Sequence, residues 1–330
     1  MKKITAITAA AALSASVLLS GCGGSQAAMK IGEYTVSQGD VEIVTDAYFS
    51  SYGDYEASKE LAVSNLRDAI TAYAVAQSRG LTLTDEEQSN VTQGKANFAK
   101  TFGSASEYNK ARKKAGADEE IIEAFIAQPL YEQKLSEAAQ LPEPTDDDLK
   151  AYFKEHYLRA KHILLMFENE SDTGLLERRA QDLLKRAQNG ENFDELVTTF
   201  SEDPGSSSAP DGYIFTDGEM VQEFEDAVKS IQPGEFTMCE SSYGYHVIQR
   251  LPLDESDEKF NEFFETYKSS VSSAKERDDL TAAIQSMAEE DGITVEVLDD
   301  VINAIPSPTP QATEEPETAD GSAETTETAE

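Results

Sequence analysis

The feature that most constrains the fold is a change of hydrophobic period partway along this chain of 330 residues. From about Ser37 to Tyr157, apolar residues recur at the spacing of amphipathic helices. At Lys161 the pattern gives way to a short apolar run, His162–Met166, which is typical of a buried central strand. Helical spacing resumes beyond Pro252. The sequence therefore predicts an α+β domain inserted in a mostly helical one.

The predicted α+β domain covers residues 157–253. Its first strand is followed by helical patterns, a loop rich in Ser, Pro and Gly, and two closing strands. The predicted segments after the first strand are helices over 175–187, 193–200 and 220–231, and strands over 236–239 and 245–251.

The helical domain is predicted in two parts, residues 29–156 and 254–302. Ser37 with Asp40, Thr84 with Glu87, and Thr145 with Asp148 have the spacing of capping boxes, which open helices. Short alternating runs over 30–36 and 293–298 predict one strand at each end of the domain. Neither strand is stable alone, so we expect the two to pair and to close a discontinuous domain.

The first residues predict an export signal. Lys2 and Lys3 precede an apolar run to Leu19, and small residues then lead to Cys22. This arrangement resembles a bacterial lipoprotein signal over residues 1–21, which implies cleavage before Cys22, lipidation of its thiol and a tether over 22–28. We then expect an extracytoplasmic protein, lipid-anchored to the bacterial cell membrane. The alternative is an ordinary secreted protein in which the cysteine is incidental.

Composition excludes several classes of partner and cofactor. The 27 basic and 63 acidic residues give a net charge of −36, which argues against binding nucleic acid or anionic lipid. Three histidines, two cysteines and the absence of a calcium-loop pattern predict neither a metal site nor a cofactor. Residues 303–330 lack aromatic and basic residues, and we expect a disordered acidic tail there.

Two histidines are placed where they can meet. His162 lies on the first predicted strand and His246 on the last, and these two strands can be neighbours in a small sheet. The loop adds Asp203, while Met220 and Phe224 are four residues apart and share a helix face. Each feature also has a plain alternative: core histidines, core apolar residues and a turn at Asp203.

A family pattern joins these residues. Five blocks occur in order, at 160–164, 190–193, 200–205, 218–227 and 233–248 (the last as Pro-Gly-Glu followed by Tyr-Gly-Tyr-His-Val-Ile). Together they resemble the parvulin-type peptidyl-prolyl cis/trans isomerases. The helical flanks resemble, in length and position, the chaperone-like domain of the PrsA and SurA foldases. The resemblance implies a parvulin-like domain inserted in a helical chaperone-like domain.

Residue roles follow from the resemblance alone. It implies a catalytic group of His162, Asp203, His246 and Ser241, with Met220 and Phe224 forming the pocket for proline. One departure stands out, because the family's Gly-Gly-Asp-Leu-Gly stretch reads Ala-Pro-Asp-Gly-Tyr over 209–213 here. The leucine that walls the pocket in the family is therefore missing.

The leading interpretation is an anchored foldase that isomerises X–Pro bonds in unfolded secreted polypeptides. A non-catalytic holdase with a degenerate isomerase domain is the alternative, and a solute-binding lipoprotein is weaker, since the repeating α/β pattern is absent. The loop after the first strand, residues 167–172, is acidic and predicts no preference for phosphorylated substrates. A monomer and a homodimer through the helical domain both stay open.

Overall fold

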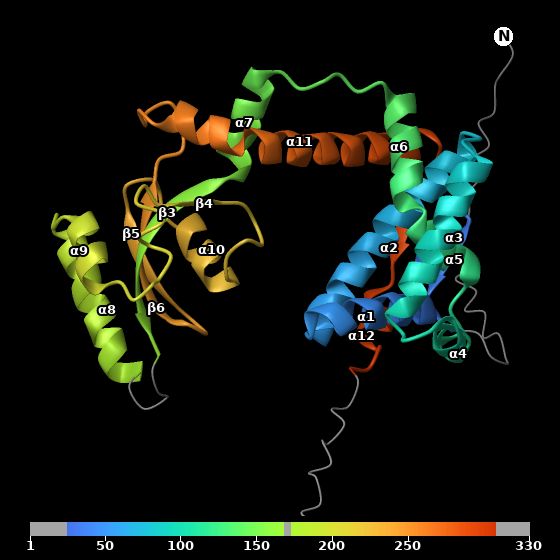
Figure 1. Cartoon of the computed structure of the whole chain (residues 1–330), viewed down its shortest axis with the longest axis horizontal. Coiled ribbons are helices and arrows are strands. Elements are labelled where there is room, and N and C mark those ends of the chain that lie inside the picture. The colour runs from blue at the N-terminus through green and yellow to red at the C-terminus, as the bar shows by residue number, and fades with distance from the viewer. Residues whose placement is uncertain (1–24, 168–172, 308–330) are drawn as a thin grey trace, which may run out of the picture. The chain divides into compact units, whose positions relative to one another are not determined.

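The computed structural model describes residues 25–167 and 173–307, which form two compact units (Figure 1). One unit combines residues 25–139 with 283–307, and the other spans residues 140–282. The predicted signal peptide, Cys22 and most of the predicted tail lie outside the described residues. No helix in the described ranges is long and apolar enough to cross a membrane.

The discontinuous unit is mostly helical, with one small sheet. Its elements are β1 (Ala27–Ile31), β2 (Tyr34–Ser37), α1 (Gln38–Tyr52), α2 (Tyr55–Ser78), α3 (Asp85–Lys100), α4 (Ala105–Ala115), α5 (Glu119–Ile126), α6 (Gln128–Ala139), the end of α11 (Phe260–Glu290), β7 (Val295–Val297) and α12 (Asp299–Asn303).

All three predicted capping boxes are confirmed, at the starts of α1, α3 and α7 (Asp146–His156). In each, the cap hydroxyl accepts the N–H of the third helical residue, whose carboxylate accepts the cap N–H in return. Asp40 does more than cap α1, because its buried carboxylate also accepts the N–H of Asp118 at 2.6 Å. This bond ties the start of α1 to the start of α5.

The sheet of this unit has the order β2-β1-β7. Met29 lies opposite Val297 in the antiparallel β1–β7 pair, so the predicted pairing of the two end strands is present. The single strand predicted over 30–36 is wrong in detail. Gly32, at a φ of +57°, turns the chain back between β1 and β2, which form a hairpin.

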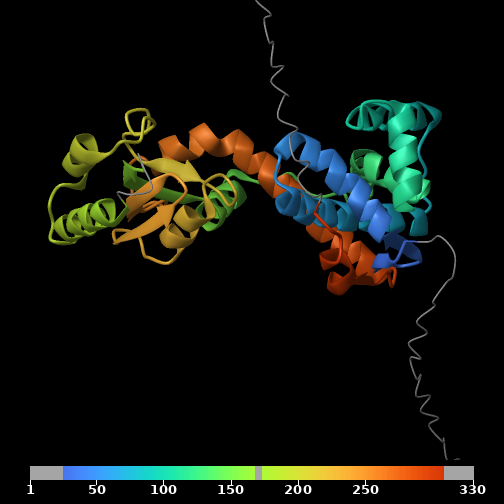
Figure 2. The same cartoon turned by 90° about the horizontal axis from the view of Figure 1, so that it is seen from below.

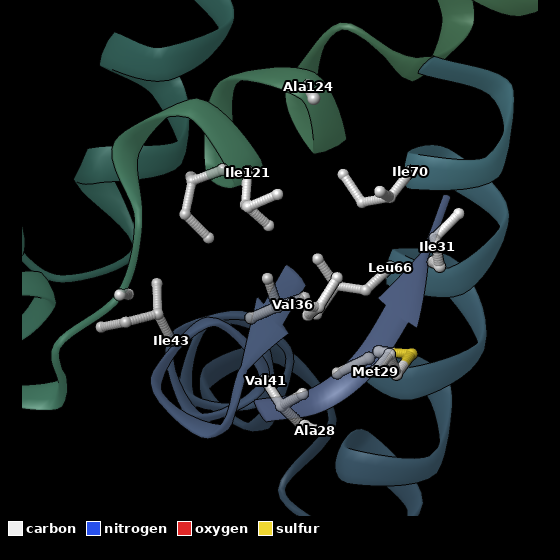
Figure 3. Close-up of a cluster of buried hydrophobic side chains, with 14 of the residues drawn as sticks. Ala28, Met29, Ile31, Val36, Val41, Ile43, Leu66, Ile70, Ile121 and Ala124 are labelled. Atoms are coloured by element: carbon white, nitrogen blue, oxygen red, sulfur yellow. The ribbon is translucent and has the colours of Figure 1, made fainter. Parts of the chain in front are cut away.

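Both ends of the described chain contribute to one apolar core. Side chains from β1, β2, α1, α2 and α5 converge in this core (Figure 3). Ile302 and Ile305 belong to the same cluster, and the blue and red segments lie side by side in Figures 1 and 2. Ile305 is only 2% exposed, so the tail predicted from residue 303 begins too early. Apolar burial extends the ordered core beyond the change in composition.

The second unit is built on a four-stranded antiparallel sheet of order β4-β3-β6-β5. The prediction that the first and last strands are central neighbours is confirmed by the β3–β6 pair. Its elements are α7, β3 (Leu158–Met166), α8 (Thr173–Gln188), α9 (Phe193–Phe200), β4 (Tyr213–Phe215), α10 (Gln222–Lys229), β5 (Phe236–Ser241), β6 (Gly244–Leu251) and the first part of α11.

Alternation along β3 and β6 sends side chains to two different cores. Ile163 and Val247 pack under α8 and α9, whereas Ala160 and Ile248 pack under α10 (Figure 1). His162 lies two residues from Ala160 and therefore shares its face. The strand period thus places the candidate histidine on the face that α10 covers.

This unit is larger than the domain predicted over 157–253. Phe153 of α7 packs with Phe260 and Phe264 of α11, and Leu253 joins the same buried cluster. Aromatic burial therefore attaches both flanking segments, which were predicted to belong to the helical domain, to the sheet unit.

Candidate active site

The two candidate histidines meet across the central strand pair. Leu164 lies opposite His246 in the register of β3 and β6, so His162 is the diagonal neighbour of His246. Their Nδ1 atoms are 3.4 Å apart. Both rings are mostly buried, with His246 only 4% exposed. The structure therefore brings together two residues that are 84 positions apart in the chain.

Two further predicted residues extend this pair at its ends. The Oγ atom of Ser241, the last residue of β5, lies 2.8 Å from His246 Nε2. Asp203, in the loop after α9, has Oδ2 at 2.9 Å from His162 Nε2. The four residues predicted to form the catalytic group thus make one continuous hydrogen-bonded chain.

The direction of these bonds follows from the acceptor at one end. An ionised carboxylate only accepts, so His162 donates from Nε2 and presents a bare Nδ1 to His246. His246 must then donate from Nδ1 and accept the hydroxyl of Ser241 at Nε2. A proton added to His162 would sit on Nδ1 and place two N–H groups face to face. A proton added to His246 would sit on Nε2, where the Ser241 hydroxyl would have to turn and accept instead of donate. The bond between the two rings therefore requires a neutral His162.

Asp203 is held ionised by its neighbours. Oδ2 accepts the hydroxyls of Tyr213 at 2.6 Å and Ser206 at 3.0 Å, and Oδ1 accepts the N–H of Gly205 at 2.9 Å. Burial raises the pKa of Asp203, but the bonds from Tyr213, Gly205 and His162 outweigh it and lower the pKa to about 2. Burial and Asp203 raise the pKa of Tyr213, so its hydroxyl stays a donor at neutral pH.

Burial acts in the opposite direction on the imidazoles. Desolvation lowers the pKa of His162, although Asp203 opposes the shift. Desolvation, with a smaller contribution from His162, lowers the pKa of His246 to about 4. Both shifts favour neutral rings, and for His162 this agrees with what the hydrogen-bond directions require.

These shifts predict how stability and the site respond to acid. An unfolded histidine takes up its proton near pH 6.5, whereas folded His246 does so only near pH 4. The contribution of His246 to the free energy of unfolding is therefore complete above pH 6.5, and it is lost as the pH falls toward 4. The chain has only three histidines, so NMR of ¹⁵N-labelled imidazoles can follow each ring separately. A normal titration of His246 near 6.5 would contradict the neutral chain.

The two predicted pocket residues do not lie on one helix face. The helix predicted from Met220 begins at Gln222, because the buried carboxylate of Glu225 accepts the N–H groups of Gly218 and Met220 and holds this segment as a loop. Met220 and Phe224 still border the same cluster under the sheet.

Phe224 forms the apolar floor of the site. Its ring packs edge-on to both imidazoles, with centroids 5.2 Å from His162 and 5.5 Å from His246. Phe224 is only 2% exposed, whereas Met220 is half-buried. Of the two predicted substrate-binding side chains, Met220 therefore keeps the larger free surface.

The altered loop over 209–213 has a structural reason. Gly212, at a φ of +91°, would place a Cβ atom 2.8 Å from the carbonyl oxygen of Ala160, so a leucine does not fit there. Tyr213 follows and packs against the cluster under the sheet, 5.6 Å from the ring of His162. The sequence shows that the leucine is missing but gives no sign that Tyr213 belongs to the site.

A cavity of about 490 Å³ is bordered by His162 and Asp203. Hydroxyl groups contribute much of its wall, and Met220 and Phe224 do not line it. Its lining residues are Lys161, His162, Asp194, Val197, Thr198, Ser201, Asp203, Ser206, Ser207, Ala209, Pro210 and Tyr213. Within 25–167 and 173–307, no group of His, Cys, Asp and Glu has the geometry of a metal site.

Comparison with known proteins identifies the domain. The family model for the PPIC-type peptidyl-prolyl isomerase domain matches residues 149–251. The foldase protein PrsA of Oceanobacillus iheyensis is 28% identical over 73% of this chain and 79% of its own length. The chaperone SurA of Pseudomonas aeruginosa is 36% identical, but over only 32% of this chain and 26% of its own length.

Among solved structures, a crystal structure of PrsA from Bacillus anthracis is 20% identical and covers 69% of this chain and 97% of its own, with a TM-score of 0.31. Residues 149–251 are thus a parvulin-type peptidyl-prolyl cis/trans isomerase domain. The chain is PrsA-like, with its isomerase domain flanked on both sides by helices.

Proposed function

We propose that this protein is a lipid-anchored, extracytoplasmic foldase that binds unfolded secreted polypeptides and isomerises their X–Pro bonds. The chain of Ser241, His246, His162 and Asp203 above the ring of Phe224 is the observation that carries the catalytic part. The similarity to proteins named foldase and chaperone supports the binding of unfolded chains.

The chemistry needs no covalent bond to break. Resonance gives the X–Pro amide a rotation barrier of about 18–20 kcal/mol, and the twisted transition state loses that resonance. A site therefore accelerates the reaction if it desolvates the amide and holds the proline ring while the bond turns. Met220 offers an apolar contact for that ring, and the neutral imidazoles avoid placing a charge beside it. In this proposal the hydrogen-bonded chain keeps the site rigid and transfers no proton.

The location rests on the N-terminal sequence. The run from Lys2 to Cys22 has the order of a lipoprotein signal, and Cys22 lies outside the described residues. More than one acyl chain at such a terminus holds a protein stably on a membrane without a spanning helix. A tethered domain meets nearby unfolded chains at a raised effective concentration, which suits a foldase.

One experiment tests the catalytic part. The mature full-length chain is added to a proline-containing tetrapeptide, and cis-to-trans exchange is followed by NMR. We expect exchange to speed up in proportion to the protein concentration. If the rate stays at background while the protein still prevents aggregation of an unfolded substrate, the non-catalytic holdase is the correct interpretation. That alternative draws on the covered ring of Phe224 and the missing leucine at 212.

A separate experiment tests the anchor. The protein is expressed with its own N-terminus in a bacterial host, and the membrane fraction is analysed by mass spectrometry. We expect an acylated N-terminal peptide that begins at Cys22. In the Cys22→Ala variant, we expect the protein to be lost from the membrane fraction. An unmodified Cys22 in protein released to the medium would contradict the anchored location and leave the isomerase standing.

A further inference from the structure

The Tyr213 hydroxyl reaches the site because it lies close to the backbone of Gly205. Tyr213 is the first residue of β4, which pairs with β3 at Ala160, and its hydroxyl reaches back over ten residues to Asp203. Gly205 makes this contact possible, because a Cβ atom there would lie 2.4 Å from the Tyr213 hydroxyl. The hydroxyl thus occupies the space that a side chain at position 205 would fill.

The Tyr213 hydroxyl and His162 donate to the same oxygen atom of Asp203. Oδ2 of Asp203 accepts the Tyr213 hydroxyl at 2.6 Å, His162 Nε2 at 2.9 Å and the Ser206 hydroxyl at 3.0 Å, while Oδ1 accepts the N–H of Gly205. Bonds from a hydroxyl to a carboxylate are short and roughly twice as strong as neutral ones. With both oxygens occupied, the carboxylate has one orientation. That orientation fixes which nitrogen of His162 carries the proton.

We propose that Tyr213 is a positioning residue for prolyl isomerisation. Its hydroxyl holds Asp203 in the orientation that sets the tautomers of His162 and His246. This inference rests on the proposed isomerase function and adds to it a residue outside the four-membered chain. The phenol ring packs beside His162 and would do so equally as phenylalanine, so the role belongs to the hydroxyl alone.

The test replaces Tyr213 by phenylalanine in the full-length protein. Loss of one hydrogen bond to a charged group predicts a fall of about tenfold in kcat/KM for prolyl peptides. Imidazole ¹⁵N shifts should show His162 and His246 exchanging between tautomers, which a purely structural role would not cause. Tyr267→Phe is the matched control, because its hydroxyl donates to the carbonyl oxygen of Ile214, next to Tyr213, and does not touch Asp203.

A second variant, at Gly205, disturbs the same hydrogen bond between Tyr213 and Asp203 without changing either residue. Gly205→Ala should displace the hydroxyl and lower kcat/KM, since the new methyl group collides with it. In the double variant with Tyr213→Phe this collision is removed, and the nearest remaining atoms are Asp203 Oδ1 at 3.3 Å and the ring carbon Cζ of residue 213 at 3.4 Å, so the loss should be close to that of Tyr213→Phe alone. This comparison keeps the proposal testable if one single variant folds poorly.

The outcomes separate the two proposals. Wild-type kcat/KM and unchanged tautomers in Tyr213→Phe would overturn the positioning role, and so would an equal loss in Tyr267→Phe. An inactive wild-type protein would overturn the isomerase function. In that case the imidazole shifts still decide whether Tyr213 sets the two tautomers.

Discussion

Replacing Asp203 by alanine is expected to lower kcat/KM for a prolyl peptide by about 100-fold, equivalent to ~2.7 kcal/mol of transition-state stabilisation. The carboxylate is the acceptor for four donors: Tyr213, Ser206, Gly205 and His162. Without it His162 has no partner at Nε2, and its proton can move to Nδ1, where it faces the N–H of His246. NMR exchange measurements on the full-length protein give the rate.

The control for this prediction is Asp217→Asn. Asp217 pairs with Lys229 at an exposed position of the same unit, and such surface pairs contribute only about 0–1 kcal/mol. The control should keep wild-type activity. Wild-type activity in Asp203→Ala would show instead that the apolar floor alone accelerates the rotation and that the hydrogen-bonded chain is dispensable.

Local signals in the sequence predicted much of the fold. Capping boxes depend on residues three positions apart, so all three could be read directly. The meeting of His162 and His246 followed from one assumption, that the first and last strands are adjacent. Both kinds of prediction use contacts that the chain specifies by spacing or by strand order.

The features that the sequence did not reveal depend on contacts across loops. The strand β4 has only three residues and follows a loop rich in Gly and Pro, which gives too short a pattern to detect. The start of α10 is set by the carboxylate of Glu225 bonding backward to Gly218 and Met220. The role of Tyr213 needs Gly205 and Gly212 in their folded positions. None of these contacts has a periodic signature.

Phe224→Ala is expected to have the largest effect on stability, a loss of about 3–5 kcal/mol in the free energy of unfolding of the sheet unit. The ring is almost completely buried between Phe215 and the two imidazoles, so its removal leaves a cavity beneath the hydrogen-bonded chain. Hydrogen–deuterium exchange in peptides from β3 and β6 should speed up strongly. Peptides from α1 and α2 belong to the other compact unit and provide the internal reference.

Phe224→Leu separates packing from the role of the ring. Leucine fills most of the volume and should recover much of the stability, but it cannot offer an aromatic edge and face to His162 and His246. We therefore expect nearly normal exchange in β3 and β6 together with reduced isomerase activity. Full activity in Phe224→Leu would mean that the floor needs only apolar volume, while unchanged exchange in Phe224→Ala would contradict the buried position of the ring.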